Sequence, residues 1–155
     1  MSQELIITSG GENIAPVTIE ETIKAELSEI VSYAVVIGDN RKHLSVILTL
    51  RTEEDNTRHP NSLHPDLVSC LERHNCTVAT IEDLLGENIP ILDKIIVSGL
   101  ERANERAQSR AHKVHKYILA TNEFSVATGE LTPTMKLKRH FILKKYKDDI
   151  ERLYA

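Results

Sequence analysis

Two short segments near opposite ends of the chain carry the residues best suited to chemistry. The first is the loop Ser9-Gly10-Gly11-Glu12, whose paired glycines permit backbone angles that other residues resist. Consecutive backbone N–H groups in such a loop can hold a phosphate, or they can simply close a tight turn. Because neither GxxxxGK[ST] nor GxGxxG occurs, residue types and spacing favour the turn.

The second segment runs from Gly129 to Arg139 and contains Lys136 at the end of a proline-containing loop. A lysine there can bring a compact positive charge to a carboxylate or phosphate and stabilise charge that develops in a transition state. Lys138 and Arg139 follow it and are candidates for phosphate contacts. The alternative is a solvated lysine beside a helix start, which residue types alone favour.

The histidines give little support to a metal site. His112 and His115 stand three residues apart, but the neighbouring Arg110, Lys113 and Lys116 would repel a cation, and no carboxylate is close in sequence to complete a site. We therefore expect no bound metal. No pattern of a catalytic serine or cysteine is present either.

Length and composition narrow the class of protein. A chain of 155 residues, 41% hydrophobic and 27% charged, fits one domain, and no apolar run approaches the length needed to cross a bilayer. No secretory signal is visible at the amino end, so we expect a cytoplasmic protein. Cys70 and Cys76 match no redox or zinc spacing and are expected to be free, partly buried thiols.

Charge is unevenly placed along the chain. Residues 1–40 carry seven acids and one lysine, whereas residues 101–147 carry eleven Lys or Arg and four acids. The basic half could face an anion, although a solvated helix face explains such a run equally simply. A nucleic-acid partner is not expected, because the net charge is −4, aromatic residues make up 4% and no recognition motif occurs.

The elements that position the two segments follow from periodicity and turn signals. An apolar stretch at 5–8 predicts a strand entering the glycine loop, and Pro16 with a Thr18/Glu21 capping box predicts a helix from about 16 to 28. Alternating apolar residues around Gly38 predict a β-hairpin of strands 31–37 and 44–50. Residues 52–64 are polar and predict an exposed connection.

The second half is expected to contain helices, further strands and a closing helix. A short helix is expected to begin at Pro65, and Thr80 with Asp83 is expected to cap another that ends at Gly86. A helix of about five turns is expected to begin at Pro90. Strands are expected at 117–120 and 124–126. The final helix should run from 138 to 153, with an inward face of Phe141, Ile142, Tyr146, Ile150 and Leu153.

This order of elements predicts an α+β domain. Its sheet should be small and mostly antiparallel, with about three strands and a short N-terminal β-ribbon, flanked by helices.

Taken together, the two segments resemble the adenylate-forming superfamily, and within it the long-chain fatty acyl-CoA synthetases. Residues 4–14 (ELIITSGGENI), followed by Pro16 and Ile19-Glu20, are similar to the segment after that family's interdomain hinge. Residues 129–139 (GELTPTMKLKR) are similar to its final motif, in a form that resembles the bubblegum-type branch. The resemblance spans nearly the whole chain and identifies residues 1–155 as a single C-terminal lid domain.

The resemblance implies a ligase that joins a fatty acid to coenzyme A through an acyl-adenylate, with ATP, CoA and Mg2+ bound to ATP as reactants. It implies that the small domain rotates between two steps. Lys136 would enter the active site for adenylation, and Ser9, Gly10, Gly11 and Glu12 would then line the pantetheine tunnel. Glycines suit that place because side chains would obstruct the thiol.

Two departures from the family pattern bear on these expectations. Gln3, ahead of Glu4, occupies the place of the hinge lysine, so either the hinge is altered or Met1-Ser2-Gln3 is an artificial start that replaces the natural hinge sequence. The large adenylating domain, which would be the partner of this chain, is absent from these residues, and alone the chain is expected to be inactive. The other interpretation is a free-standing module that binds CoA, a nucleotide or an anionic membrane surface with its basic carboxy-terminal half. The basic helix 138–147 could meet the 3′-phosphate of CoA or lipid headgroups, or it could be the solvated face of a packed helix.

Overall fold

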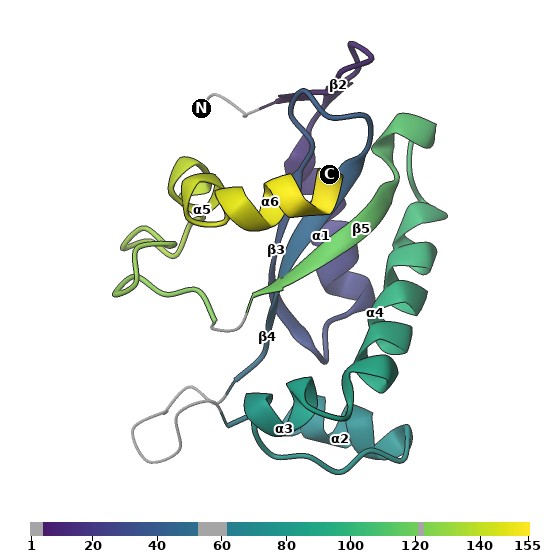
Figure 1. The fold of residues 1–155 in the computed structure, drawn as a ribbon, viewed down its shortest axis with the longest axis vertical. Coiled ribbons are helices and arrows are strands. Elements are labelled where there is room, and N and C mark those ends of the chain that lie inside the picture. Colours follow the sequence, from purple (N-terminus) through teal and green to yellow (C-terminus); the bar gives the residue numbers. More distant parts are fainter. Residues whose placement is uncertain (1–4, 53–61, 121–122) are drawn as a thin grey trace.

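The computed structural model describes residues 5–52, 62–120 and 123–155, which form two small sheets and the helices around them (Figure 1). Strands β1 (Ile6–Ile7) and β2 (Asn13–Ile14) pair as an antiparallel ribbon. Strands β3 (Val31–Ile37), β4 (Leu44–Leu50) and β5 (Val114–Ala120) form a sheet with β4 in the centre. The predicted ribbon, hairpin and three-stranded sheet are confirmed.

The helices are α1 (Pro16–Glu26), α2 (Pro65–Arg73), α3 (Ile81–Leu85), α4 (Ile89–Asn104), α5 (Arg139–Lys145) and α6 (Lys147–Tyr154), with a 3-10 turn η1 (Arg110–His112). The predicted cap of α3 is confirmed, because the Thr80 side chain accepts a hydrogen bond from the Asp83 N–H. None of the described helices is long and apolar enough to span a bilayer. Most of the predicted connection at 52–64 lies outside the described residues.

Strand β5 runs parallel to β4, whereas β3 and β4 are antiparallel. The chain between β4 and β5 carries α2, α3 and α4, and such a crossover returns the next strand in the same direction. Strand β5 also begins three residues earlier than predicted. The Asn104 side chain at the end of α4 accepts from the Val114 N–H and donates to its carbonyl, both at 2.9 Å, and so fixes that start.

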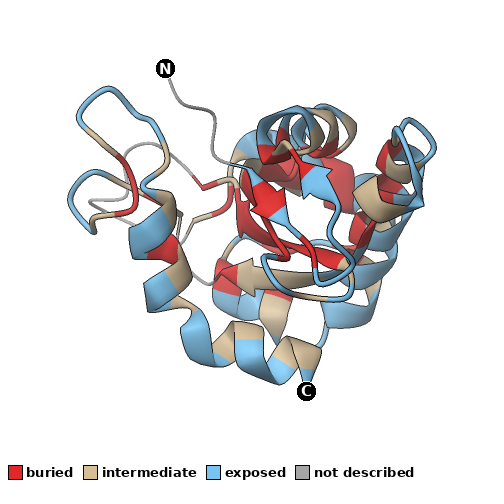
Figure 2. Cartoon of the chain, turned by 90° about the horizontal axis from the view of Figure 1, so that it is seen from above, coloured by how far each residue is buried: buried red, intermediate tan, exposed pale blue. Residues whose placement is uncertain are grey.

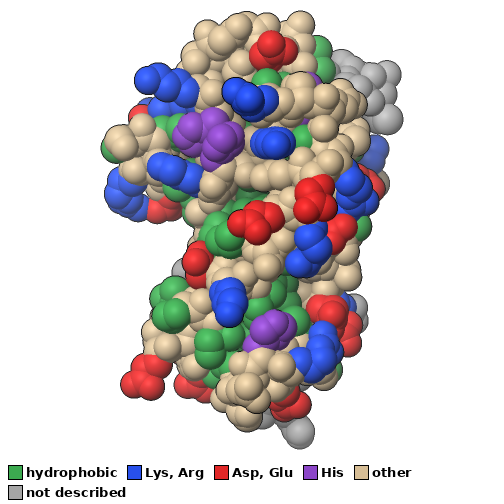
Figure 3. All heavy atoms as spheres, turned by 90° about the vertical axis from the view of Figure 1, so that its right-hand side faces the viewer, with side chains coloured by type: hydrophobic (Ala, Val, Ile, Leu, Met, Phe, Trp, Pro, Cys, Tyr) green, Lys and Arg blue, Asp and Glu red, His purple; other side chains and the backbone are tan. Residues whose placement is uncertain are grey.

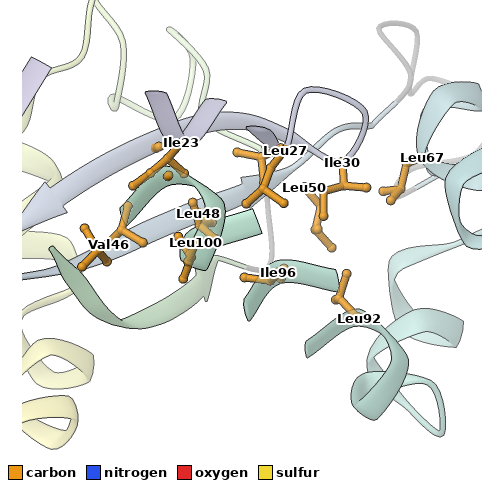
Figure 4. Packing of buried hydrophobic residues seen from close by; sticks show 14 of the residues in the cluster. Ile23, Leu27, Ile30, Val46, Leu48, Leu50, Leu67, Leu92, Ile96 and Leu100 are labelled. Atoms are coloured by element: carbon orange, nitrogen blue, oxygen red, sulfur yellow. The ribbon is translucent and has the colours of Figure 1, made fainter. Parts of the chain in front are cut away.

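The sheet is buried on both faces, which explains why every residue of β4 is buried. Figure 2 shows the buried residues on the strands and on the sides of the helices that face them. On one face, Val46, Leu48 and Leu50 pack against α1 and α4 (Figure 4). These residues belong to the first core cluster, which also contains Cys70 and Cys76. On the other face, Ile47 packs under the C-terminal segment with Phe124, Leu131 and Ile142, and these four residues belong to the second core cluster.

The C-terminal segment departs from the sequence predictions in three ways. Residues 124–126 form no strand, because buried Phe124 fills the second core cluster instead of joining the sheet. The predicted single helix is divided at Tyr146 into α5 and α6. Phe141 is 42% exposed and does not face inward; its ring lies against Gly129, where a Cβ would come within 2.8 Å of it.

Two smaller predictions also need correction. The helix α1 begins at Pro16 with Ala15 as its N-cap, so Thr18 lies inside the helix and does not cap it. Cys70 and Cys76 are free, as predicted, but they are fully buried rather than partly buried, because both belong to the first core cluster.

We expect Gly99→Ala to destabilise the domain by about 2 kcal/mol, as overpacked core positions do. A Cβ at Gly99 on α4 would overlap the side chain of Leu27, the C-cap residue of α1, including its Cγ, which cannot swing away easily. Alanine's better helix propensity offsets at most about 1 kcal/mol of this cost. Urea unfolding measures the effect, with the exposed neighbouring change Ser98→Ala as control. A variant as stable as the wild type would contradict this account of the contact between the two helices.

The end of α6 packs against a pair of stacked histidines beside the sheet. The rings of His43 and His115 lie 4.9 Å apart, and the Tyr154 hydroxyl donates to the His43 carbonyl at 2.8 Å. Partial burial lowers the pKa of His115, and the neighbouring His43 and Lys113 lower it further. Protonation of His115 is therefore harder in the folded chain than in the unfolded chain.

This predicts acid sensitivity with a definite sign. Because the unfolded chain binds the proton more tightly, the contribution of neutral His115 to stability is complete above its unfolded pKa and is lost as pH falls through the lowered folded pKa. We expect the melting temperature of His115→Gln to fall less than that of the wild type between about pH 7.5 and about pH 5. His112→Gln is the control and should keep the wild-type slope. Equal slopes for His115→Gln and the wild type would refute the prediction.

Candidate functional site

The glycine loop joins β1 to β2 and is held by its own backbone. The Thr8 N–H donates to the Glu12 carbonyl at 3.1 Å, and the Gly11 N–H donates back to Thr8 at 2.9 Å. The Ser9 N–H donates to the carbonyl of Arg41 in the turn between β3 and β4, at 2.9 Å. These amides are occupied within the chain, so the geometry favours the tight turn over a phosphate cradle.

The two glycines of this loop are needed for different reasons. Gly11 has a φ of +85°, a left-handed conformation that other residues adopt only with strain. Gly10 has no such requirement, since it lies outside the left-handed region and a Cβ there would meet only the Thr8 Oγ1 at 3.9 Å. Nothing within the described residues therefore requires glycine at position 10, and Ser9 to Glu12 are all exposed. The bare backbone at Gly10 is suited to close approach by something outside this chain.

Lys136 lies on a small hairpin that precedes α5. The Met135 N–H donates to the Thr132 carbonyl at 2.8 Å, the Thr132 N–H donates to the Lys136 carbonyl at 2.8 Å, and Leu131 pairs with Leu137. The hairpin is anchored because Leu131 is buried in the second core cluster. A rigid, core-anchored turn thus carries the lysine.

The side chain of Lys136 projects from this turn into solvent. It is exposed, and among the described residues no ion pair or hydrogen bond engages its ammonium group. Met135, directly before it, has a φ of +66°, an uncommon conformation for a residue with a side chain. Such backbone strain, of about 1 to 2 kcal/mol, persists where the surroundings impose it, often at functional sites.

The two other basic candidates, Lys138 and Arg139, differ in the contacts that their side chains make within the chain. Arg139 is committed to buried Glu20: its two terminal nitrogens donate to the two carboxylate oxygens, Nη1 to Oε2 at 2.6 Å. Lys138 is exposed, and its ammonium lies over the Phe141 ring. Phosphate binding by Lys138 and Arg139 stays a prediction, and Arg139 would have to leave Glu20 to take part.

The remaining predicted residues are placed as follows. Gln3 and Glu4, the hinge-proximal pair, lie outside the described residues. The structure does not bring the glycine loop and Lys136 together: the ribbon is at the top of Figure 1, and the hairpin before α5 is at the left. A single binding site within this chain therefore cannot use both.

The described residues contain no group of three His, Cys, Asp or Glu arranged to hold a metal ion. His112 belongs to η1, where its Nδ1 lies 2.7 Å from the Ser109 hydroxyl, and the His115 ring lies against that of His43, which directly precedes β4. The two histidines that suggested a metal pair are thus engaged separately.

A basic surface surrounds η1 and the start of β5. Figure 3 shows Lys, Arg and His side chains gathered on the upper part of this face, while acidic side chains are interspersed lower down. Its exposed cations are Arg106, Arg110, Lys113 and Lys116. Arg106 pairs with Glu26 on α1, so part of this charge is neutralised.

Sequence reasoning gave no role to Glu20, which with Glu130 is one of the two buried acids among the described residues. It is 5% exposed, and it shares one face of α1 with Ile23 and Leu27. Glu20 lies three residues before Ile23 and seven before Leu27, and this spacing predicts that its carboxylate faces the core. The sequence could not predict its partner, because 119 residues separate Glu20 from Arg139.

The comparisons with known proteins show the family to which the chain belongs. Residues 3–95 match the family model of the AMP-binding enzyme C-terminal domain. The chain is 42% identical over 154 residues to the long-chain-fatty-acid–CoA ligase ACSBG1 of Mus musculus, covering 98% of this chain and 21% of that protein. The Drosophila melanogaster long-chain-fatty-acid–CoA ligase heimdall is also 42% identical, over 176 residues, with 98% of this chain and 25% of that protein covered. The chain thus spans about a fifth to a quarter of these relatives.

Solved structures share the fold at low sequence identity. The adenylation domain of a carboxylate reductase from Mycobacterium chelonae superposes with a TM-score of 0.70 and 20% identity, covering 97% of this chain and 19% of that one. The corresponding domain from Segniliparus rugosus, in complex with AMP and a co-purified carboxylic acid, gives 0.62 and 18%, covering 97% and 20%. The predicted α+β fold is confirmed by this likeness.

Proposed function

Because this chain belongs to the AMP-binding enzyme C-terminal domain family, we propose that it is the mobile lid domain of a long-chain-fatty-acid–CoA ligase. The identity to such ligases over 98% of the chain supports the assignment. The observation that supports the mechanism is the separate placement of two exposed loops, one with bare backbone at its glycines and one with a lysine (Figure 1). An adjoining adenylating domain would meet them one at a time.

In the first step, a carboxylate oxygen of the fatty acid attacks the α-phosphorus of ATP, and diphosphate leaves with the electrons of the broken P–O bond. Both reactants are anions, so their approach is opposed by charge. Lys136 is placed to lie between them, since its ammonium is exposed on a rigid turn. A cation fixed there stabilises the charge that gathers in the transition state.

In the second step, the domain turns and presents the loop of Ser9 to Glu12. The thiol of coenzyme A loses its proton and attacks the acyl carbonyl, and AMP leaves as the acyl–oxygen bond breaks. A narrow passage for the pantetheine arm needs a wall without side chains. Gly10 would supply such a wall, and the absence of any contact among the described residues that requires a glycine there supports this role.

Mg2+ would enter bound to the phosphates of ATP, where it neutralises part of their charge. The described residues of this chain offer no three-residue cluster for it, so its ligands would be the nucleotide and the adjoining domain.

The proposal is tested on the full-length protein that contains this chain. Purified enzyme is given palmitate, ATP and CoA, and the release of AMP, diphosphate and acyl-CoA is measured. We expect equal amounts of the three products, and no acyl-CoA from the 155-residue chain alone. ATP cleavage that does not depend on a fatty acid would refute the ligase assignment.

The basic surface near η1 favours a second candidate function, a module that holds a nucleotide or an anionic surface without catalysis. Calorimetry of the isolated chain with CoA and with AMP separates the two. The lid-domain proposal expects no tight binding, since half of each site would be supplied by the adjoining domain. Tight binding by the isolated chain would favour the module.

A further inference from the structure

The carboxylate of Glu20 joins three elements of the fold. It belongs to α1, it accepts hydrogen bonds from Arg139 at the start of α5, and it accepts one from the Val36 N–H of β3 at 2.8 Å. The side chains of Glu20 and Arg139 are 6% and 14% exposed. Burial raises the pKa of Glu20, while the hydrogen bonds and charge of Arg139 act in the opposite direction. The ionised carboxylate therefore depends on this arginine.

The pair also closes the free edge of the sheet. Strand β3 is an edge strand, so an outward N–H on it has no neighbouring strand to accept its hydrogen bond. Glu20 provides the acceptor for Val36 and so fixes α1, through its own side chain, against that edge.

Each helix held by this pair leads directly to one of the two candidate loops. Helix α1 begins at Pro16, just after the β-ribbon that carries Ser9 to Glu12. Helix α5 begins at Arg139, three residues after Lys136, and the Lys138 N–H closes the base of the hairpin on the Glu130 carbonyl at 2.8 Å. Glu20 and Arg139 are 119 residues apart in sequence. Their ion pair therefore connects the helix that follows the glycine loop to the helix that follows the Lys136 hairpin.

The chemistry of the pair makes it suited to fixing an angle and not only a distance. Two parallel N–H···O bonds between a guanidinium and a carboxylate keep both groups in one plane, which an apolar contact does not do. A lysine at position 139 would keep the positive charge but could not make the two parallel hydrogen bonds of the guanidinium. Arg139 thereby controls the direction in which the first turn of α5, and the hairpin before it, leaves the core.

We propose that Glu20 and Arg139 are positioning residues, which orient the Lys136 hairpin relative to the body that carries the glycine loop. The inference rests on the proposed function. Neither residue needs to touch a substrate. The pair holds the Lys136 side chain in the orientation that it needs during adenylate formation. A misplacement of about 1 Å at such a site lowers the reaction rate strongly.

Arg139→Met in the full-length enzyme tests the proposal through the two half-reactions. We expect the turnover of adenylate formation to fall at least about tenfold with the KM for ATP nearly unchanged. Thioester formation from supplied acyl-adenylate should change less than about twofold to threefold, because the glycine loop is also fixed by its bond to Arg41. Arg139→Lys should recover only part of the lost turnover. The matched control is Arg102→Met, which removes another arginine paired with α1 but far from the hairpin in sequence.

A double variant, Glu20→Gln with Arg139→Met, separates positioning from stability. It leaves no buried charge unpaired, and the glutamine carbonyl still accepts from Val36, so the melting temperature should recover. The proposal requires that turnover does not recover with it. Recovery of both, or a parallel fall of both half-reactions in Arg139→Met, would overturn the positioning role.

A readout that needs no catalysis keeps this result distinct from a failure of the ligase assignment. Spin labels on Ser9→Cys and Lys136→Cys report the distance between loop and hairpin, and native Cys70 and Cys76 are buried and react slowly. We expect one narrow distance distribution, which broadens in Arg139→Met and stays narrow in Arg102→Met. A distribution unchanged by Arg139→Met would overturn the proposal even in an active enzyme. An inactive wild type with the expected broadening would instead reject the ligase assignment alone.

Discussion

Replacing Lys136 by alanine in the full-length ligase is expected to lower the rate of acyl-adenylate formation by about a hundredfold or more. The ammonium group is carried by a turn that the core holds in place, so the substitution removes the positive charge without moving the hairpin. Stability should hardly change, because the side chain is exposed and makes no ion pair or hydrogen bond among the described residues. Fatty-acid-dependent exchange of labelled diphosphate into ATP measures the step.

Thioester formation from supplied acyl-adenylate should be largely spared in the same variant. In the proposed mechanism the second step uses the glycine loop, and the ribbon that carries this loop lies apart from the segment before α5 in Figure 1. Lys144→Ala is the control, since it removes an exposed lysine from the next helix and should leave both steps unchanged. An equal loss in both half-reactions would mean that Lys136 does not act in adenylation alone.

The reverse pattern is expected for Gly10→Val. Thioester formation should fall about tenfold or more, because a branched side chain would stand where the thiol arm must pass, while adenylate formation should be spared. The substitution is a clean probe of approach from outside, since a Cβ at Gly10 has open space and requires no left-handed backbone. The transfer of acyl-adenylate to CoA is followed by the appearance of acyl-CoA.

Two related variants show whether size or folding explains the loss. Gly10→Ala should give a smaller loss than valine, in proportion to the bulk it adds. Gly11→Ala should destabilise the domain by about 1 kcal/mol, because its φ of +85° strains any residue with a side chain. If Gly10→Val lowers the melting temperature as Gly11→Ala does, its kinetic effect cannot be assigned to the passage.

The sequence was sufficient for features that depend on neighbouring residues. Periodicity and turn chemistry predicted the ribbon, the β3–β4 hairpin and the cap at Thr80, because each is decided within a few residues. The two candidate loops were found the same way, one by its glycines and the other by its lysine in a proline-containing segment. Their chemical roles came from resemblance and stay predictions.

The errors arose where distant residues decide the structure. Phenylalanine is common in strands, but Phe124 packs into the second core cluster and does not pair with a neighbouring strand. Phe141 fits the apolar period of a single helix, yet it is 42% exposed and its ring lies against Gly129, twelve residues before it in the sequence. The link between Glu20 and Arg139 could not be predicted, since only the folded sheet edge brings them together.

The placement of β4 in the centre of the sheet has a consequence for how much chain makes a folding unit. The family model matches residues 3–95 and so ends within α4, before β5 and before the cover of the second sheet face. A polypeptide of that extent would leave one edge of β4 without its partner strand, and it would leave Ile47 uncovered. Open edges and bare apolar faces favour aggregation. The last 60 residues are therefore as much a condition for folding the glycine loop as they are the carrier of the lysine.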